Sequence, residues 1–277
     1  MQEACYLCDE RLLQIYLERS LPRVQYEWIK AHLDACDHCW TRWNRYRWER
    51  AKGTQGYAEL QAYLGDDFQE YFDSSRALRR EWSQRNPQTK EQIEQFFTET
   101  TSYLYNLVIW QESGHRPPYI SYAEPFLQQY QSHTICDFGC GVGNDGLHLL
   151  TQGYEVIFCE FDNSSSKFLR WRLQQRNMNA RWVHPYDIAS IQADTLWVLD
   201  VIDHLPDPQA TLHPLLATCQ TLIYENDHAC KKHGLQSFHF DHDERALHAI
   251  FLSYGFQRDA SAIQLNVWHK VRHTNNP

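Results

Sequence analysis

The sequence predicts an α/β fold in which a mostly parallel sheet of seven strands carries helices on both faces. Three observations lead to this prediction. Short apolar segments alternate with helical patterns over residues 131–277. A glycine-rich turn, Asp137-Phe-Gly139-Cys-Gly141-Val-Gly143, follows the first apolar segment. Acidic residues follow the next segments, at the strand ends where open α/β sheets bind their ligands.

The predicted strands and helices alternate in order along this part of the chain. Strands are expected at 134–138, 155–159, 180–184, 195–199, 220–225, 256–260 and 264–271. Helices are expected between most of them, at 145–152, 164–177, 208–217 and 243–254. Such alternation is typical of parallel strands joined by helical crossovers.

A short helical region is expected at the start of the chain. Residues 12–17 predict a first helix, and Pro22 stands where a second helix can begin, because proline is tolerated in a first turn. The second helix is expected to end at Cys36-Asp-His-Cys39. Its apolar stripe has helical spacing and comprises Val24, Trp28, Ile29 and Leu33.

Residues 51–130 are rich in Glu, Gln, Arg and aromatic residues, which predicts a helical cap or linker. One long amphipathic helix is expected from Phe96, Phe97, Tyr103, Leu104, Leu107, Val108 and Trp110. The segment 114–118, which contains one glycine and two prolines, ends this helix. Residues 122–130 predict a further helix that leads into the first strand.

Composition and charge exclude several classes of protein. At 277 residues and a formal net charge of −9, the chain can bury a full core and lacks the charge of a nucleic-acid-binding protein. It has no apolar run long enough to span a membrane and no secretory signal at its start, so we expect a cytoplasmic protein. Nine cysteines, an odd count, favour reduced thiols over a disulfide framework.

The spacing of the glycines distinguishes between two kinds of cofactor. In a dinucleotide-binding turn the third glycine follows the first by five residues. Here that position is Asn144, and the third glycine comes one place earlier, at Gly143. The pattern Asp-x-Gly-x-Gly-x-Gly resembles the first motif of class I S-adenosylmethionine (SAM)-dependent methyltransferases. The resemblance covers about half of the chain and implies a Rossmann-like fold with SAM as the methyl donor.

Four strand ends would hold SAM according to this resemblance. A carboxylate after the second strand, Glu160, is expected to accept hydrogen bonds from the ribose hydroxyls, and Asp162 is its weaker competitor. Asp187, after the third strand, is expected to accept from the adenine amino group. The full predicted set of cofactor-binding residues is Asp137, Gly139, Cys140, Gly141, Gly143, Glu160, Phe161, Asp187, Ile188 and Asp200.

The acceptor side is predicted from the segment after the fourth strand. Residues 200–208 look like the Asp-Val-x-Glu-His-x-Pro-Asp-Pro stretch of many small-molecule methyltransferases, with Asp203 in place of Glu. His204 is either a general base or a helix-capping residue. A second histidine cluster, His239 and His242 around Asp241, contains metal-ligand residue types, although a packed or surface pair is the simpler interpretation. The predicted catalytic residues are His204, Asp203 and Tyr105.

The N-terminal cysteines predict a zinc site. Thiolates and imidazole are the ligands of tetrahedral zinc. The stretch from His32 to Cys39, His-x3-Cys-x2-Cys, resembles the motif of zinc-binding anti-sigma domains. Two ligand sets stay open: one of Cys5 and Cys8 together with His32, Cys36 and Cys39, or the four cysteines alone. The neighbouring residues predict a docking surface for the methyltransferase domain or for a partner, and these are Trp40, Trp43, Tyr46, Arg47 and Trp48.

These patterns predict three regions: a helical zinc-binding segment at 1–50, a helical cap at 51–130 and a SAM-binding methyltransferase domain at 131–277. The resemblance implies an enzyme that methylates a small molecule, such as a natural-product intermediate. Two alternatives remain. The acceptor is a protein or peptide recruited by the zinc segment, or the chain is a non-catalytic SAM-sensing or regulatory protein. Nucleic-acid and membrane partners are not expected.

Overall fold

The computed structural model describes residues 9–225, 239–240 and 242–271, and the chain divides into two compact units. Unit 1 comprises the residues up to Arg80 together with Thr101–Pro117. Unit 2 comprises Glu81–Thr100 and the residues from Pro118 onward. The predicted regions 1–50, 51–130 and 131–277 stay a prediction, and the two units divide the middle one between them.

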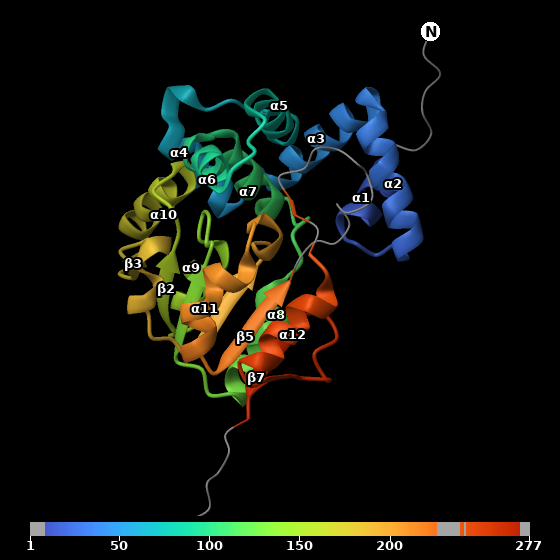
Figure 1. The fold of residues 1–277 in the computed structure, drawn as a ribbon. Helices are drawn as coiled ribbons and strands as arrows, with labels where there is room; N and C mark the ends of the chain where they lie inside the picture. Colours follow the sequence, from blue (N-terminus) through green and yellow to red (C-terminus); the bar gives the residue numbers. More distant parts are fainter. Residues whose placement is uncertain (1–8, 226–238, 241, 272–277) are drawn as a thin grey trace, which may run out of the picture. The chain divides into compact units, whose positions relative to one another are not determined.

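Unit 2 is built on one sheet, which confirms the predicted fold class (Figure 1). The strands are β1 (Thr134–Phe138), β2 (Glu155–Cys159), β3 (Arg181–Val183), β4 (Thr195–Leu199), β5 (Thr221–Glu225), β6 (Phe256–Arg258) and β7 (Asn266–Lys270). Their order in the sheet is β3-β2-β1-β4-β5-β7-β6. Neighbours from β3 to β5 pair in parallel, and β7 pairs antiparallel with both β5 and β6.

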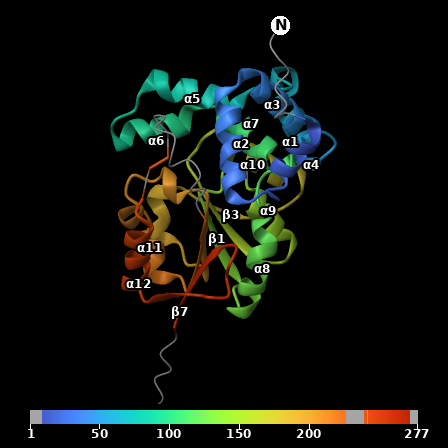
Figure 2. The same cartoon turned by 90° about the vertical axis from the view of Figure 1, so that its right-hand side faces the viewer.

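Helices cover both faces of this sheet (Figure 2). One face carries α8 (Tyr119–Gln129), α9 (Asn144–Thr151) and α10 (Ser164–Gln175), and the other carries α11 (Pro208–Thr218) and α12 (Glu244–Ser253). Because side chains alternate along a strand, β1 sends Cys136 and Phe138 into the core with α11 and α12. It sends Ile135 into the core with α8 and α9. Strands buried on both faces are apolar throughout, which is why their positions are readable in the sequence.

The strand order reverses between β1 and β4, and this reversal positions the site. β1 pairs with β2 on one side and with β4 on the other, so that Asp137 lies between Phe158 and Trp197. The turns that follow β1, β2 and β4 therefore meet at one edge of the sheet. In open α/β sheets that edge is where ligands bind.

Unit 2 also contains helix α6 (Lys90–Glu99), which precedes the sheet in the chain. A capping box between Thr89 and Gln92 begins this helix. Phe96 packs edge-on against Trp82, near the end of α5 (Ser74–Arg85), with 5.0 Å between ring centroids.

The prediction of one long helix across Phe96–Trp110 is wrong. Helix α6 ends at Glu99, and a separate helix, α7 (Ser102–Glu112), begins in unit 1. Thr100 between them is extended and buried. Its hydroxyl donates to the Glu81 carboxylate at 2.6 Å, and its carbonyl accepts from the Ser164 hydroxyl at 2.9 Å. These two contacts, both within unit 2, hold Thr100 out of helical conformation.

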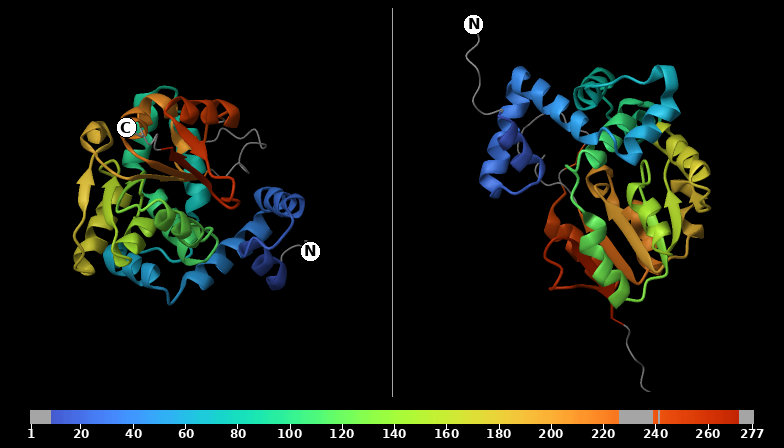
Figure 3. Two further views of the ribbon diagram at one scale, coloured as in Figure 1. Left: turned by 90° about the horizontal axis from the view of Figure 1, so that it is seen from below. Right: turned by 180° about the vertical axis from the view of Figure 1, so that it is seen from behind.

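Unit 1 is helical, and its first three helices lie side by side (blue in Figure 3). Its helices are α1 (Glu10–Leu17), α2 (Arg23–Ala35), α3 (Asp37–Ala51), α4 (Gln55–Leu64) and α7, with the start of α5. In α2, Ile29 and Leu33 are buried as predicted, whereas Val24 and Trp28 are 81% and 55% exposed. The predicted stripe is thus half wrong, because at 100° per residue Val24 and Trp28 point about 100° or more away from the buried pair.

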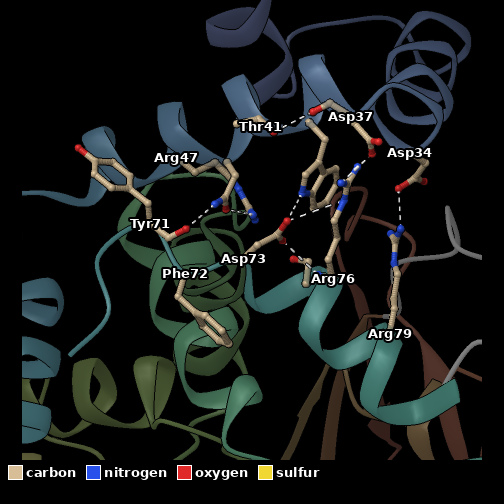
Figure 4. A network of polar contacts seen from close by, with 12 residues as sticks. Asp34, Asp37, Thr41, Arg47, Tyr71, Phe72, Asp73, Arg76 and Arg79 are labelled. Carbon is tan, nitrogen blue, oxygen red and sulfur yellow. Dashed lines mark hydrogen bonds and ion pairs between the residues drawn. The ribbon is translucent and has the colours of Figure 1, made fainter. Parts of the chain in front are cut away.

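The aromatic residues of α3 form the interior of unit 1, so the predicted docking surface is wrong for Trp40, Trp43 and Trp48, which are all buried. Figure 4 shows how the segment after α4 holds this helix. The Trp40 indole donates to the Asp73 carboxylate at 2.8 Å, and Arg76 pairs with both Asp73 and Asp37.

A buried cation completes this network (Figure 4). The Arg47 guanidinium donates to the Asn44 side chain at 3.2 Å and lies over the rings of Trp40 and Trp43. Burial lowers the pKa of Arg47 to about 10, so the side chain stays charged at neutral pH.

Across the part of the chain that the structure describes, every helix is too short or too polar to cross a lipid bilayer.

Candidate cofactor and acceptor site

The glycine turn after β1 has a backbone that only glycine adopts readily. Gly139, Gly141 and Gly143 have φ angles of +68°, +53° and +73°. A Cβ on Gly139 would lie 2.6 Å from a methyl group of Val201, and one on Gly143 would lie 2.3 Å from a methyl group of Leu169. The turn therefore depends on these glycines for both conformation and space, and it leads directly into α9.

A fourth glycine of the turn was missed by the sequence reasoning. A Cβ on Gly146, in the first turn of α9, would lie 2.7 Å from the Asp137 carboxylate and 2.1 Å from the Phe158 ring. Gly146 thus lets α9 approach the buried Asp137 carboxylate near the end of β1. The available signal was a glycine inside a helical pattern, where it costs about 1 kcal/mol relative to alanine.

Glu160, directly after β2, turns its carboxylate back to the glycine turn. One oxygen accepts from the Gly141 backbone N–H at 3.0 Å, and the other accepts from the Phe161 N–H at 2.9 Å. Burial raises the pKa of Glu160, and these backbone donors oppose that rise. The competing carboxylate, Asp162, is 63% exposed and pairs with Arg170. The geometry favours Glu160 as the residue that faces the turn.

An aromatic cluster follows the ends of β2 and β3. The Phe161 ring lies edge-on to His184 and Tyr186, with centroid separations of 5.5 and 6.2 Å. Tyr186 was not among the predicted residues, although it lies next to the predicted Asp187. The residue is 71% exposed. Its hydroxyl donates to Glu94 of α6 at 2.5 Å. Rings in this position offer flat apolar surface to a base.

The other predicted residues after β3 differ from each other in burial. Both belong to a short 3-10 helix, η3 (Pro185–Ser190). Asp187 is exposed, so its carboxylate is open to a ligand or to water. The Ile188 side chain is buried in the core with α11.

Asp200, the residue directly after β4, has a strained backbone conformation. Its φ is +57°, which costs a non-glycine residue about 1 kcal/mol or more. Its backbone N–H donates to the Glu225 carbonyl at 2.8 Å, and its carboxylate accepts from the Tyr119 hydroxyl at 3.0 Å. Backbone strain of this kind is common at binding sites.

A polar cluster follows Asp200 in a second short 3-10 helix, η4 (Ile202–His204). The Asp203 carboxylate lies 3.8 Å from the His239 imidazole, and the rings of His204 and His239 are 4.5 Å apart. The edge of Phe97, from α6, packs on His204 with centroids 5.3 Å apart. Asp203 and His204 therefore lie together as predicted, and His239 joins them.

The predicted cluster of His239, Asp241 and His242 is divided differently. Asp241 lies outside the described residues. The His242 ring nitrogen lies 2.9 Å from the Leu205 carbonyl, whereas His239 faces Asp203. The two histidines thus have separate partners.

Tyr105, the third predicted catalytic residue, belongs to the aromatic interior of unit 1. Its hydroxyl accepts from the Gln69 backbone N–H at 2.8 Å and donates to the Asp67 carbonyl at 3.3 Å. Its ring packs against Phe72, with centroids 5.0 Å apart. The structure therefore gives this hydroxyl a structural role in holding the segment after α4.

Three of the five predicted zinc ligands converge in unit 1. The side-chain donor atoms of His32, Cys36 and Cys39 all lie within 4.8 Å of one another, and His32 is 3.2 Å from the Cys39 sulfur. Hydrogen bonds from Cys39 lower the pKa of Cys36, which favours its thiolate. In tetrahedral zinc two thiolates lie about 3.8 Å apart, so the arrangement fits that ion. Cys5 and Cys8 lie outside the described residues.

The match to a known protein family lies within unit 2. Residues 136–220 match the family model described as a methyltransferase domain. No curated protein sequence matches the chain. The solved structure of magnesium protoporphyrin IX methyltransferase from Synechocystis PCC 6803 with bound SAM is 14% identical, with a TM-score of 0.45 over 79% of this chain and 99% of that chain. The N-terminal domain of EvdMO1, in the presence of SAH and D-fucose, is 16% identical, with a TM-score of 0.42 over 57% and 84%.

The family match covers the glycine turn, Glu160, Asp187 and the segment after β4. The prediction of a class I SAM-dependent methyltransferase domain is thereby confirmed. The N-terminal zinc-binding segment has no such match and stays a prediction.

Proposed function

We propose that this enzyme transfers a methyl group from SAM to a small-molecule acceptor held beside η4. The observation that supports this most is the placement of α6, whose Glu94 contacts Tyr186 and whose Phe97 contacts His204. One helix thus touches both the aromatic cluster after β3 and the polar cluster after β4. A helix in that position restricts the size of an acceptor and keeps water from it.

The residues of unit 2 suit the parts of SAM. The glycine turn would let the methionine portion approach the backbone closely, and the Glu160 carboxylate, which faces this turn, would accept from the ribose hydroxyls. Phe161 and Tyr186 would flank the adenine, and Asp187 would accept from its amino group. SAM supplies a methyl group on a positively charged sulfur.

Methyl transfer is an in-line displacement, so the main task of the protein is to position the acceptor. The bond from sulfur to the methyl carbon breaks as the bond from the acceptor atom to that carbon forms. An oxygen or nitrogen acceptor also loses a proton. Asp203, His204 and His239 are the groups at the acceptor side that can promote that loss.

Isothermal titration of the full-length protein with SAM and with S-adenosylhomocysteine tests the cofactor assignment. We expect saturable binding of both. Gly141→Ala, at φ +53°, should abolish it, whereas Gly255→Ala, at φ +84° with nothing within 4 Å of its Cβ, should retain it. A wild-type protein that binds neither ligand would overturn the proposal.

The acceptor is then sought by incubating the protein with SAM labelled in its methyl group and fractions of small metabolites. Label in a small molecule supports the proposal. Label found only in a protein or peptide supports the alternative of a recruited protein substrate. Binding of SAM without any transfer supports the alternative of a SAM sensor.

We also propose that unit 1 holds one structural zinc ion through His32, Cys36, Cys39 and one of Cys5 and Cys8. The contact between His32 and Cys39 supports the histidine-containing ligand set over four cysteines. Elemental analysis of purified protein should find about one zinc per chain. His32→Ala should lower that content, and His38→Ala, at the exposed position between the two cysteines, should not. Zinc near zero in fresh wild-type protein contradicts the site.

A further inference from the structure

We propose that Asp203, His204 and His239 form a binding site for a divalent transition-metal ion, which holds a hydroxyl oxygen of the acceptor. This inference rests on the proposed methyl transfer and specifies its acceptor chemistry. Its ligands come from η4 and from a residue 36 positions later in the chain, so no sequence motif joins them.

The three side chains have the spacing of metal ligands. Their donor atoms all lie within 4.8 Å of one another, and Asp203 Oδ2 lies 3.8 Å from His239 Nε2. Around an ion with bonds of about 2.1 Å, neighbouring donors lie about 3 to 3.4 Å apart. Small side-chain rotations would therefore bring all three onto one ion.

The backbone holds His239 beside Asp203. The Phe240 N–H donates to the Asp203 carbonyl at 2.5 Å, which fixes the residue next to His239 against η4. From the other side, the Phe97 ring packs on His204. Two ligands are thus restrained by contacts that do not involve their donor atoms.

The surroundings of the Asp203 carboxylate favour a bound metal ion over an acid–base pair between Asp203 and His239. Asp203 is only 7% exposed, and its Oδ1 has no hydrogen-bond partner among the residues that the structure describes. Its other oxygen lies 3.8 Å from His239, which is too long for a hydrogen bond. A buried carboxylate with so little compensation is costly, and a bound cation offsets that cost.

The donor types identify the class of metal. Two imidazoles and one carboxylate suit Mn²⁺, Fe²⁺, Co²⁺ or Zn²⁺, whereas Mg²⁺ and Ca²⁺ prefer oxygen ligands. Three protein ligands leave positions open for water or substrate. The site differs from the candidate zinc site of unit 1, whose described ligands include two thiols. A hard ion such as Mn²⁺ therefore distinguishes between them.

A metal ion bound here would make the acceptor hydroxyl more acidic, and this hydroxyl must lose its proton in the transfer. A hydroxyl bound to a divalent metal has a lowered pKa and releases its proton to water. The resulting oxygen forms a bond to the methyl carbon as the carbon–sulfur bond breaks and its electron pair returns to sulfur. The products are a methyl ether, the neutral thioether and one proton, so charge and atoms balance.

The test is titration of full-length protein with Mn²⁺, followed by the electron paramagnetic resonance signal of the free ion. Wild-type protein should show one saturable site per chain. Asp203→Asn and His239→Gln should each weaken binding by about 10- to 100-fold or more. His242→Gln, whose histidine contacts the Leu205 carbonyl instead, should bind like wild type. His204→Gln, at a half-buried position, repeats the test if replacement of buried Asp203 unfolds the protein.

Two outcomes overturn the metal site: wild-type protein without saturable Mn²⁺ binding, or folded His204→Gln and His239→Gln proteins that bind Mn²⁺ as wild type does. Calorimetry with SAM on the same samples separates this failure from that of the proposed function. SAM binding without metal binding rejects the metal site alone. Metal binding without SAM binding rejects the proposed function and leaves the site.

Discussion

The Tyr186 hydroxyl donates a 2.5 Å hydrogen bond to the Glu94 carboxylate, which joins the turn after β3 to helix α6. At the C-terminal end of α6, the Ser164 hydroxyl donates to the Thr100 carbonyl at 2.9 Å. Both donors follow strands whose ends carry proposed cofactor residues. Helix α6 is thus attached at its middle and at its C-terminal end to the segments that follow β3 and β2.

We expect Tyr186→Phe to loosen α6 without unfolding the sheet. Because Tyr186 is exposed, its hydrogen bond contributes at most about 1 kcal/mol, so amide exchange in Lys90–Glu99 should accelerate by up to about 5-fold. Hydrogen-exchange mass spectrometry measures this. Tyr254→Phe, which removes a hydroxyl bonded to His213, is the matched control and should leave α6 unchanged. Equal protection of α6 in both variants would contradict its attachment through Tyr186.

Gly143→Ala should destabilise the fold, because the new Cβ meets Leu169 at 2.3 Å and the residue has φ +73°. We expect a loss of about 2 to 4 kcal/mol in the free energy of unfolding, from overpacking and strain together. Gly153→Ala is the matched control. It has φ +88° with nothing within 4 Å, so only strain of about 1 to 2 kcal/mol applies. Urea unfolding that ranks the two variants equally would show that the Leu169 contact is relieved cheaply.

Glu160→Gln should weaken SAM binding and remove one source of pH dependence from the stability of the ligand-free protein. Burial raises the pKa of Glu160. A carboxyl whose pKa is higher in the folded state contributes stability below its unfolded pKa and loses that contribution as pH rises through the folded pKa. Glutamine does not ionise, so the variant avoids this loss. The loss of charge-assisted hydrogen bonds should weaken SAM binding by about 10- to 100-fold.

Urea unfolding of both proteins at about pH 4 and about pH 8 checks the stability difference between them, which should shift in favour of the variant as the pH rises. Calorimetry with SAM checks the affinity. Stability curves that run parallel at the two pH values would mean that Glu160 has an ordinary pKa in the folded protein.

Asp73→Ala should destabilise unit 1 by about 2 to 3 kcal/mol, because it leaves the buried Trp40 indole N–H without its acceptor and removes a partner of Arg76. Asp37→Ala is the comparison. It also removes a partner of Arg76, but its side chain is 91% exposed, so the cost should stay below about 1 kcal/mol. Urea unfolding measures both. Similar losses would assign the effect to Arg76 and not to Trp40.

Much of the sheet is predictable from the sequence for a physical reason. β1, β2 and β4 begin and end at the predicted residues, because strands buried on both faces are short apolar runs between polar turns. The glycine turn is predictable for a similar reason, since positive φ angles and close contacts such as that of Gly143 with Leu169 restrict the residue type.

Tertiary contacts decide what the sequence could not. The helix break at Thr100 depends on Glu81 and Ser164, neither of which is adjacent in the chain. His239 reaches Asp203 through a backbone hydrogen bond of Phe240, and no residue spacing encodes that approach. Tyr105 has the residue type of a catalytic group, but its surroundings in unit 1 use its hydroxyl for packing. The local sequence pattern thus predicts helices and strands, whereas contacts between residues distant in the chain decide what each side chain does.

The division of the chain into units has a consequence for its synthesis. The polypeptide passes into unit 2 after Arg80, returns to unit 1 after Thr100 and leaves it again after Pro117. On the ribosome, Glu94 therefore emerges 92 residues ahead of Tyr186. At roughly 5 to 20 residues per second, α6 waits roughly 5 to 20 s for Tyr186 and the segment around it. During that interval Phe97, which packs on His204 in the folded protein, is open to chaperones and to other nascent chains.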